Sequence, residues 1–557
     1  MRRFFKNGSI IFSKKQTSIL SAAVVIMATV GISRFLGLLR DRFLAGTFFG
    51  GNEWQLDVYF AAFRIPDMVF QLLVLGALSA AFIPVFSGIL EDDKEKANSF
   101  ASTLINFLSL FFLIFSIVVF VLAKDLSQLI APTFSPNEIS LMVNLIRIML
   151  LAQFFFGISN FLTGVIQSNQ RFLVPALAPV VYNLGIIFGI VVLSPKWGIY
   201  GPVFGVVLGA FLHLLIQIPL SLKLGFRYSF SWNFKLQEVK EVGRLMLPRT
   251  LGLAVNQIEL TVAVYLATSM TSGSLAIFYF AQHLMNLPVG LFGSTISQAA
   301  LPSLSRQTAK KKIEEFKDTF LTSFNQIMFL ALPAGMILLI LRIPLVRIVF
   351  GAPNFPWKAT LLTGKVLAIF SLSIFAQAAI QLLVRGFYAL HDTKSPFWIG
   401  ALSVLVNVAL SLLFILGFDL GILGLAWAIT LASFLQAILL ILFLNKKVDG
   451  FDRKRLFIPF LKTSVATLLT GMALWAPMRL MDKFIVDTTR VLGLVLLTVV
   501  VFIIGMGFYL ILAYLLRIEA LSHFATLFKR FSRWQSVLQE SEEIITTSSS
   551  DLVSEET

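Results

Sequence analysis

Long apolar stretches recur along almost the whole chain, and they restrict its fold more than any other feature. Each has about 20 mostly apolar residues, the length that an α-helix needs to cross a bilayer. Hydrophobic residues make up 57% of the 557 residues and charged residues only 13%, which is too little polar surface for a water-soluble protein of this size. The sequence therefore predicts an all-α polytopic membrane protein.

We expect fourteen transmembrane helices and, at the two ends of the chain, segments outside the bilayer. The predicted spans are 18–46, 56–88, 100–123, 139–167, 173–194, 200–223, 245–269, 274–303, 319–348, 361–385, 396–417, 420–445, 457–480 and 490–516. Residues 1–17 are basic, and because the first apolar stretch continues without an obvious cleavage site, we interpret it as an uncleaved helix. Residues 517–557 predict an amphipathic segment on the membrane surface, followed by a disordered end.

Lysine and arginine are distributed unevenly between the two sides of the predicted bundle. An even number of helices places both termini on one side, and the loops on that side carry most of the basic residues. This asymmetry predicts a multi-pass membrane protein with both termini in the cytoplasm. It also accounts for the net charge of +16 without a nucleic-acid partner.

Three short patterns recur in the second half of the chain at nearly the same offset, which suggests an internal duplication. The pairs are 79–87 with 297–305, 164–175 with 386–396, and 198–201 with 421–424. Six predicted helices separate the copies, so the repeats run parallel, as in transporters built from two equivalent halves. We therefore expect two pseudo-symmetric six-helix lobes at 18–225 and 240–445, two extra C-terminal helices at 457–516, a central cavity and alternating access by rocking.

The first two predicted helices carry charged residues that are costly in lipid. The first contains Arg34, Arg40, Asp41 and Arg42, and the second contains Asp57, Arg64 and Asp67. An arginine at the bilayer centre costs about 2.5–3.5 kcal/mol, so these side chains must face protein or a watery cavity. For Arg42 and Asp67 we favour a packing role. For Arg34 and Arg64 we favour binding of a pyrophosphate, because guanidinium groups bind phosphate oxygens in a bidentate manner.

Two further charges fall in predicted helices of the second lobe, Glu259 and Lys365, and we expect both to be buried. A lone carboxylate in a membrane is a candidate proton or sodium site, and it is equally well explained as the counter-ion of a cavity arginine. Asn256, Gln257 and Asn407 could coordinate an ion or form hydrogen bonds between helices. Glu259 and Asn407 are our candidates for ion coupling.

Several chemistries have no matching residues in the sequence. There is no cysteine, and the four histidines show no metal-ligand spacing. Nucleotide-binding loops, zinc-protease motifs and Ser-His-Asp arrangements are also missing. We therefore expect a transporter rather than an enzyme, with no cofactor or metal, driven by a Na⁺ or H⁺ gradient, the membrane potential or the substrate gradient.

Several motifs together resemble the MurJ (MviN) lipid II flippase family of the MOP exporter superfamily. They are Ser-Arg-Phe-Leu-Gly-Leu-Leu-Arg-Asp at 33–41, Asp57 to Pro66, Gly76 to Pro84, Gly164 to Phe172, Leu287 to Gly293 and Arg385 to Pro396. The resemblance covers roughly residues 18–516. It implies fourteen helices that move lipid II from the inner to the outer leaflet of the bacterial cytoplasmic (inner) membrane for peptidoglycan synthesis. It also implies a groove for the polyprenyl tail beside the last two helices, contact with membrane lipids and, as possible partners, the peptidoglycan-synthesis machinery.

The resemblance also implies roles for individual residues. The substrate-binding positions fall on Arg34, Arg40, Asp41, Asp57, Arg64, His283 and Arg385. His283 stands where the family has an arginine in the eighth helix. The basic and acidic residues that many members have later in the second helix are Phe70, Gln71 and Leu75 here, and the acidic residues that some members use for sodium are Ala263 and Ser411.

Three functions remain open from the sequence. The first is a lipid II flippase, and the second is a flippase for another polyprenyl-pyrophosphate-linked oligosaccharide, which would also need basic residues in its cavity. A drug exporter of the same superfamily would instead need carboxylates there. The third is a non-transporting membrane scaffold, which the missing family arginines keep open.

Overall fold

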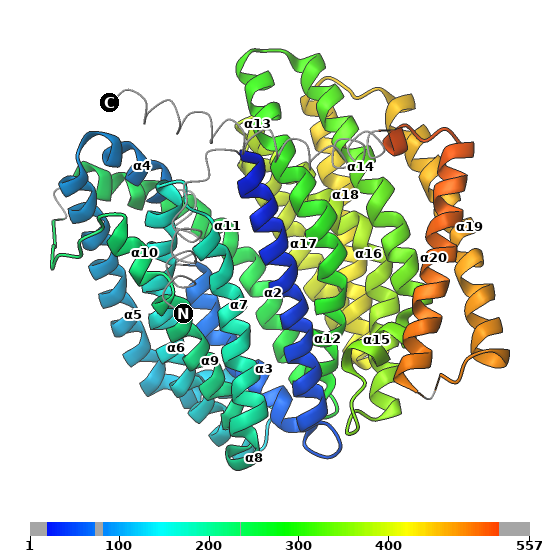
Figure 1. The fold of residues 1–557 in the computed structure, drawn as a ribbon, viewed down its shortest axis with the longest axis horizontal. Helices are drawn as coiled ribbons and strands as arrows, with labels where there is room; N and C mark the ends of the chain where they lie inside the picture. The colour runs from blue at the N-terminus through cyan, green and yellow to red at the C-terminus, as the bar shows by residue number, and fades with distance from the viewer. Residues whose placement is uncertain (1–18, 73–81, 234–235, 489, 523–557) are drawn as a thin grey trace, which may run out of the picture. The chain divides into compact units, whose positions relative to one another are not determined.

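The computed structural model describes residues 19–72, 82–233, 236–488 and 490–522, and every regular element within them is a helix (Figure 1). In this part of the chain, eleven helices are long and apolar enough to cross a membrane, and they match the predicted third to sixth and eighth to fourteenth spans. The other three predicted spans, 18–46, 56–88 and 245–269, overlap the helices Ile19–Phe48, Glu53–Phe70 with Ile83–Asp92, and Gln237–Thr268, and each includes positions outside the part of the chain that the structure describes in full. The count of fourteen stays a prediction.

The described chain divides into two compact units. The first unit is built from Met1–Leu287, Arg342–Phe370 and Lys394–Gln436, and the second from Pro288–Leu341, Ser371–Thr393 and Ala437–Thr557. The prediction of one six-helix lobe before and one after residue 240 stays a prediction.

The first unit contains most of the helices. They are α2 (Ile19–Phe48), α3 (Glu53–Phe70), α4 (Ile83–Asp92), α5 (Lys94–Ile130), α6 (Pro136–Ser168), α7 (Leu173–Phe188), α8 (Ser194–Trp197), α9 (Tyr200–Leu215), α10 (Ile218–Lys223), α11 (Gln237–Thr268), α12 (Ser274–Pro288), α15 (Arg342–Phe350) and α17 (Lys394–Leu412). The last residue of α12, Pro288, is counted with the second unit. The second unit contains α13 (Thr295–Ala309), α14 (Ile313–Ile340), α19 (Arg453–Phe484) and α20 (Val491–Leu515). Two helices contribute to both units, α16 (Trp357–Ala389) and α18 (Gly421–Lys447). Short π-helical turns follow α7, α12 and α17 at Gly189–Leu193, Val289–Ser294 and Leu413–Gly417.

One predicted helix is wrong at its outer end. The sequence predicts a single span over 319–348, but α14 ends at Ile340 and α15 begins as a separate helix at Arg342. Leu341 interrupts the helical backbone with φ −87° and ψ 15°. Arg342 and Arg347 therefore belong to a short helix of their own, which removes two charges from the predicted span.

Glycines allow α7 and α9 to pack with their backbones in contact. Gly185 and Gly189 on α7 and the adjoining π-turn face Gly201, Gly205 and Gly209 on α9, all at a spacing of four residues. A Cβ atom added to Gly185 would lie 2.5 Å from the Cα of Gly209, and one added to Gly205 would lie 2.8 Å from the carbonyl oxygen of Gly185. Such small-residue seams let membrane helices pack closely where no hydrophobic driving force exists.

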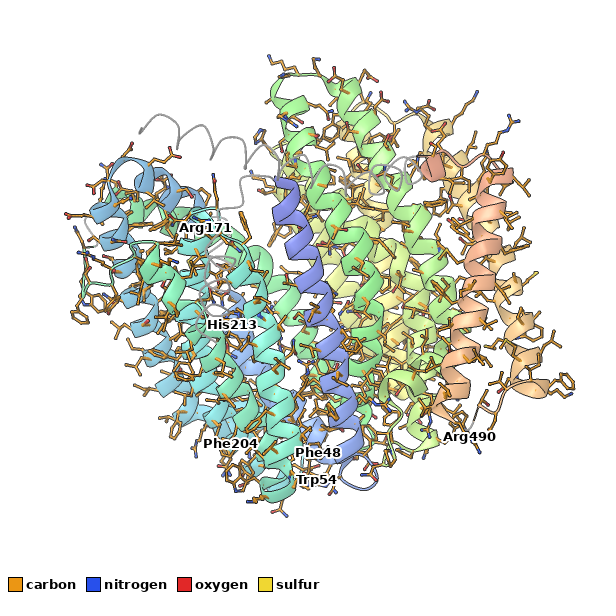
Figure 2. All side chains as sticks on the ribbon, in the orientation of Figure 1. Phe48, Trp54, Arg171, Phe204, His213 and Arg490 are labelled. Atoms are coloured by element: carbon orange, nitrogen blue, oxygen red, sulfur yellow. The ribbon has the colours of Figure 1, made fainter. Side chains whose placement is uncertain are left out.

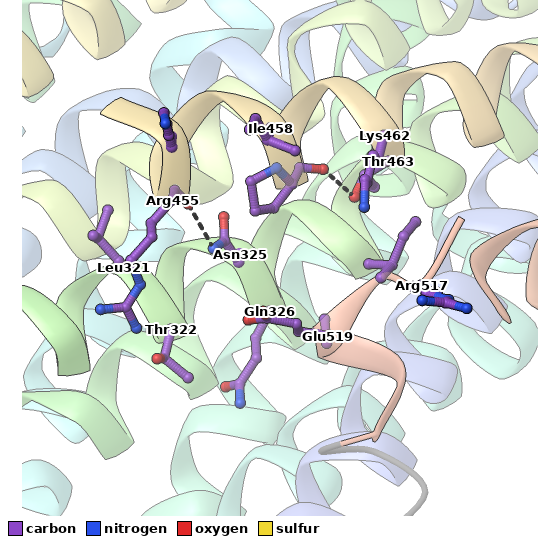
Figure 3. A pocket seen from close by; sticks show the side chains of 14 residues that line it. Leu321, Thr322, Asn325, Gln326, Arg455, Ile458, Lys462, Thr463, Arg517 and Glu519 are labelled. Carbon is purple, nitrogen blue, oxygen red and sulfur yellow. Dashed lines mark hydrogen bonds between the residues drawn. The ribbon is translucent and has the colours of Figure 1, made fainter. Parts of the chain in front are cut away.

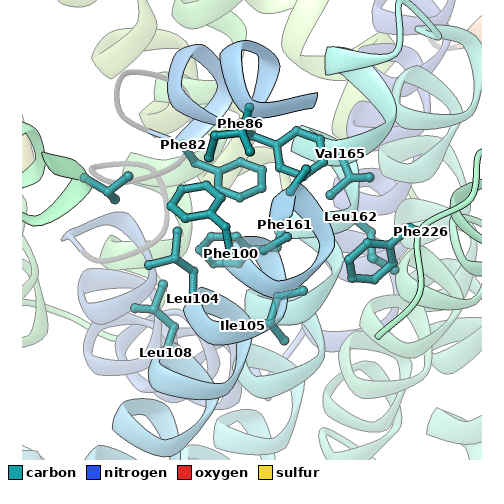
Figure 4. Packing of buried hydrophobic residues seen from close by; sticks show 14 of the residues in the cluster. Phe82, Phe86, Phe100, Leu104, Ile105, Leu108, Phe161, Leu162, Val165 and Phe226 are labelled. Atoms are coloured by element: carbon teal, nitrogen blue, oxygen red, sulfur yellow. The ribbon is translucent and has the colours of Figure 1, made fainter. Parts of the chain in front are cut away.

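Aromatic packing joins α4, α5 and α6 in the first unit (Figure 4). The ring of Phe82 lies 5.2 Å from that of Phe86, 5.8 Å from that of Phe100 and 5.2 Å from that of Phe161. All four side chains are at most 1% exposed. Because large rings dominate the buried area of such a cluster, these contacts fix the angles between the three helices.

A buried polar cluster connects α6 with α9 and with Gln217, which follows α9. The Oγ of Ser159 lies 2.7 Å from Nδ1 of His213, and the Gln217 side-chain amide donates to the same Oγ at 2.7 Å. Figure 2 labels His213 on α9. Each polar group is satisfied by another one, which is how polar residues are tolerated inside a helix bundle.

In the second unit α14 packs against α19, and α19 packs against α20. The Tyr509 hydroxyl donates a hydrogen bond to the Phe329 carbonyl oxygen at 2.7 Å, and the two rings lie 5.3 Å apart. Ala466 and Ala513 are fully buried in the same cluster. Small and aromatic residues therefore alternate along this interface, which holds the last two helices on α14.

Candidate functional site

Three of the predicted binding residues form one polar cluster on α2 and α12 in the first unit. The Arg40 guanidinium donates to Oδ1 of Asp41 from Nε at 3.0 Å and from Nη2 at 2.8 Å. Nδ1 of His283 lies 2.7 Å from Oδ2 of the same carboxylate. Asp41 is 1% exposed, whereas the side chains of Arg40 and His283 are 21% and 31% exposed. Arg40 and His283 therefore hold the buried Asp41 carboxylate, while their own side chains remain partly exposed.

Asn183 on α7 extends this cluster. Its Oδ1 accepts from Nη1 of Arg40 at 3.3 Å, and its Nδ2 donates to the backbone and side-chain oxygens of Ser33 at 3.3 Å. Sequence reasoning missed Asn183. A signal was present, since it is a strongly polar residue in the apolar segment Leu173–Phe188.

Arg34, one and a half turns before Arg40 on α2, is held much more loosely. Its Nη1 donates to the backbone carbonyl of Asn286 on α12 at 3.3 Å. Among the described residues its guanidinium has no carboxylate partner. Most of its five N–H donors are therefore available to another anionic group.

Arg64 on α3 is 4% exposed and is fixed by neutral oxygens. Its Nε donates to Oγ1 of Thr261 at 2.8 Å, and its Nη2 donates to the carbonyl and side-chain oxygens of Gln257 at 2.7 and 2.6 Å. Within the part of the chain that the structure describes, no carboxylate forms an ion pair with it. Its positive charge is therefore oriented by α11 but not neutralised there.

Asp57, near the start of α3, contacts backbone rather than a basic side chain. Its Oδ2 accepts from the N–H of Gly273 at 2.6 Å and its Oδ1 from the N–H of Ala276 at 2.9 Å. These N–H groups belong to the first turn of α12, where backbone donors have no partner within the helix. A carboxylate there also interacts favourably with the helix dipole. Asp57 therefore caps α12 from a different helix.

The two candidates for ion coupling contact each other. Nδ2 of Asn407 on α17 donates to Oε1 of Glu259 on α11 at 2.6 Å, and Ser411 donates to Oδ1 of Asn407 at 3.3 Å. Asn407 is 3% exposed, and Glu259 is partly buried. The expectation that Lys365 is also buried is wrong, because it lies on an exposed face of α16. Glu259 has no basic residue in ion-pair contact within the described ranges.

Arg385 belongs to the second unit. Its Nη1 donates to the carbonyl oxygen of Ser294 at 2.8 Å and to the hydroxyl of Ser297. These contacts join α16 to the start of α13. Arg42, for which we favoured a packing role, donates to the Ile348 carbonyl at 2.6 Å, near the C-terminal end of α15.

The structure thus groups the predicted residues of the first unit into three sets. The first set lies where α2 contacts α12 and contains Arg34, Arg40, Asp41 and His283. The second is Arg64 of α3, which donates hydrogen bonds to α11. The third is the pair Glu259 and Asn407, which joins α11 to α17. The partners Asn183 and Thr261 lie 143 and 197 residues away from the arginines that they contact. The guanidinium groups of these sets belong to Arg34, Arg40 and Arg64, and each has the chemistry to bind a phosphate oxygen.

Comparisons with known proteins show which family the chain is similar to. The family model described as lipid II flippase MurJ matches residues 46–496. A probable lipid II flippase MurJ of Bdellovibrio bacteriovorus is 28% identical over 512 residues, covering 90% of this chain and 96% of that protein. One from Rhizobium tropici is 29% identical over 509 residues, covering 88% and 92%.

Solved structures agree with this assignment. A structure of lipid II flippase MurJ in an inward closed conformation has a TM-score of 0.74 and 26% identity, covering 88% of this chain and 98% of that one. An inward-facing multidrug resistance MATE family transporter of the MOP superfamily shares the fold, with a TM-score of 0.64, 12% identity and coverage of 77% and 98%. The eleven apolar helices among the described residues, together with this family, indicate a multi-pass inner-membrane protein. The chain belongs to the MurJ lipid II flippase family.

Proposed function

We propose that this chain is a lipid II flippase. It moves the undecaprenyl-pyrophosphate-linked peptidoglycan precursor from the inner to the outer leaflet of the cytoplasmic membrane by alternating access. One observation carries the proposal beyond the family relationship: Arg34 and Arg64 make hydrogen bonds only to neutral oxygens among the described residues. Positive charge that is kept unpaired inside a membrane protein is costly, so it indicates an anionic ligand.

The arginines have different tasks in this mechanism. Arg64 is fixed by Gln257 and Thr261 before the substrate arrives, so little conformational entropy is lost when a phosphate binds. Arg34 makes one long contact and is free to turn toward the headgroup. The Arg40 guanidinium is held by Asp41 and Asn183. It therefore contributes positive potential and does not move to contact the headgroup.

Energy coupling is part of the proposal. Glu259 is a partly buried carboxylate whose one side-chain contact is a neutral amide, so it can bind and release a proton as the surrounding helices move. The sodium acids that the family resemblance implies are replaced by Ala263 and Ser411. We therefore assign the coupling to H⁺ rather than Na⁺, with the membrane potential as the alternative driving force.

The remaining assignments follow from the family. Both termini lie in the cytoplasm, and the polyprenyl tail lies beside α19 and α20. Partners are lipid II itself, the surrounding lipids and the enzymes of peptidoglycan synthesis that supply and use the precursor.

Complementation tests the proposal directly. The chain should restore growth to a strain depleted of its own lipid II flippase, and a leaflet-resolved assay should show lipid II returning to the outer leaflet. Growth failure with normal membrane insertion would support the scaffold hypothesis instead. If the purified chain bound another polyprenyl-pyrophosphate-linked oligosaccharide and not lipid II, the substrate assignment would be wrong.

A further inference from the structure

A basic cavity lies in the second unit, and none of its lining residues is among those assigned above. It has a volume of about 260 Å³ and is enclosed by α14, the first turns of α19 and the segment after α20 (Figure 3). The basic residues that line it are Lys454, Arg455 and Lys462 from α19 and Arg517 after α20, and its acidic lining residue is Glu519. The lining therefore carries an excess of positive charge.

Most of this charge is not neutralised by the protein. Arg455 forms an ion pair with Asp318, at 2.5 Å between Nη1 and Oδ1. The side chains of Lys454, Lys462 and Arg517 have neither an ion pair nor a hydrogen bond within the described ranges. Three cations around one cavity repel each other, so an anion bound there would lower their electrostatic energy.

Local structure holds the walls of the cavity in place. Nδ2 of Asn325 on α14 donates to the carbonyl oxygen of Arg455 at 3.2 Å, and the Thr463 hydroxyl donates to the carbonyl of Pro459 at 2.8 Å (Figure 3). Arg517 has a φ of +53°, in the left-handed region, directly after α20 ends.

An apolar helix face begins at the same cavity. Ile458 lines the cavity and is 48% exposed, and Leu461, Val465, Leu468 and Met472 are 64%, 40%, 62% and 70% exposed. Their spacing places all five on one face of α19. In a membrane this face contacts acyl chains, so the occupant of the cavity lies at the end of a lipid-facing surface. A soluble anion would make no use of that surface.

We propose that this cavity binds the phosphate headgroup of an anionic phospholipid, with an acyl chain along the exposed face of α19. The three unpaired cations contact the phosphate, and Ile458 marks the change from headgroup to acyl chain. Basic groups at a membrane surface attract anionic lipids in this way. The cavity lies at one end of α19, the helix beside which the polyprenyl tail of lipid II is proposed to lie, but none of its lining residues is assigned to lipid II, and the inference holds whether or not the chain flips lipid II.

Photolabelling of the full-length chain in nanodiscs tests the site. The probes are phosphatidylglycerol and phosphatidylcholine that carry a photoreactive group on the acyl chain, with no lipid II present. Labelling of residues 454–472 should be stronger with phosphatidylglycerol. In the double variant K462Q/R517Q it should fall about 30-fold, because each of the two cations near the surface contributes roughly 1 kcal/mol of attraction.

Two further variants separate a local effect from a general one. K483Q/R490Q removes the same charge at the other end of α19 and α20, where Figure 2 shows Arg490, and it should leave the labelling unchanged. The charge-conserving variant K462R/R517K should retain most of it. Equal labelling by the two lipids, or unchanged labelling in K462Q/R517Q, would overturn the proposal. Displacement of the lipid by millimolar inorganic phosphate would show a site for soluble anions and would also overturn it.

Discussion

At the scale of single residues, the two arginines of α2 differ in how their charge is used. Arg40 is held by a carboxylate and by Asn183, whereas Arg34 makes a single hydrogen bond to a backbone carbonyl at 3.3 Å. A guanidinium that is already paired must break contacts to bind a ligand, and an unpaired one need not. Arg34 is therefore the residue whose removal most directly tests the binding of an anion.

Substitution of Arg34 by alanine should abolish complementation of a flippase-depleted strain. Arg34→Lys should restore growth only in part, because an ammonium keeps the charge but loses the bidentate fork. Growth and leaflet-resolved lipid II would be measured at equal membrane abundance. Arg479→Ala, which removes an exposed charge on α19, is the matched control and should complement fully. Normal growth of Arg34→Ala would remove this residue from the mechanism.

His283 gives a second test in the same cluster. Its Nδ1 lies 2.7 Å from the buried Asp41 carboxylate, and the family resemblance implies an arginine at this position. His283→Arg should therefore retain complementation, because a guanidinium can donate to the same oxygen. His283→Leu should lower it several-fold, because one carboxylate oxygen would lose its donor. The readout is again growth together with outer-leaflet lipid II, and equal activity of both variants would contradict the expected role.

The charged residues of this site could be predicted from the sequence, but their partners could not. Arg34 and Arg64 were recognisable because charge inside an apolar stretch is costly. Thr261 and Asn183 are ordinary polar residues, and their roles depend on which helix faces meet across 197 and 143 residues. Lys365 is a charged residue whose surroundings the sequence did not predict. Its position in an apolar stretch suggested that it is buried, but the packing of α16 leaves its side chain exposed.

At the scale of helices, the start of α12 depends on a residue from α3. Asp57 accepts hydrogen bonds from Gly273 and Ala276, so one carboxylate satisfies two backbone donors and connects two helices. A side chain from a distant helix has no local sequence signature of the kind that marks ordinary helix caps. The family resemblance implies that Asp57 binds substrate, and this role stays a prediction. The structure shows that Asp57 caps α12.

Asp57→Ala should destabilise the protein by roughly 1–3 kcal/mol, because two buried N–H groups would lose their acceptor. Asp57→Asn keeps one acceptor oxygen and should cost less. Thermal unfolding in detergent would measure both variants, with Glu241→Gln on α11 as an exposed carboxylate control. Unchanged unfolding of Asp57→Ala would contradict a capping role.

The glycine seam between α7 and α9 allows a sharper test of helix packing. In Gly205→Ala the new Cβ would lie 2.8 Å from the Gly185 carbonyl oxygen and 2.9 Å from the Ile186 Cα, so the helices must separate. We expect a loss of about 1–3 kcal/mol of stability, the usual cost of overpacking. Gly507→Ala on α20 meets no atom within 4 Å and should be neutral or slightly stabilising. Equal thermal stability of the two variants would contradict close packing at this seam.

At the scale of the whole molecule, hydropathy was sufficient to locate most of the helices. The eleven apolar helices could be predicted because each has the length and composition that a bilayer requires. The helices α2, α3 and α11 carry Arg34, Arg64 and Glu259, and charge within these largely apolar stretches is what marked them as functional candidates. The break at Leu341 was missed because apolar residues continue on both sides of it.

Glu259 connects the local site to the transport cycle and gives a test of the whole molecule. In Glu259→Gln the amide oxygen can still accept from Asn407, so the contact between α11 and α17 is preserved while proton binding is lost. Lipid II translocation in proteoliposomes should therefore lose its response to an imposed pH gradient but keep any response to the membrane potential. Glu241→Gln, on the same helix and exposed, should behave like the unmodified chain. A pH-gradient response that survives in Glu259→Gln, or an unmodified chain that responds only to sodium, would exclude Glu259 as the coupling residue.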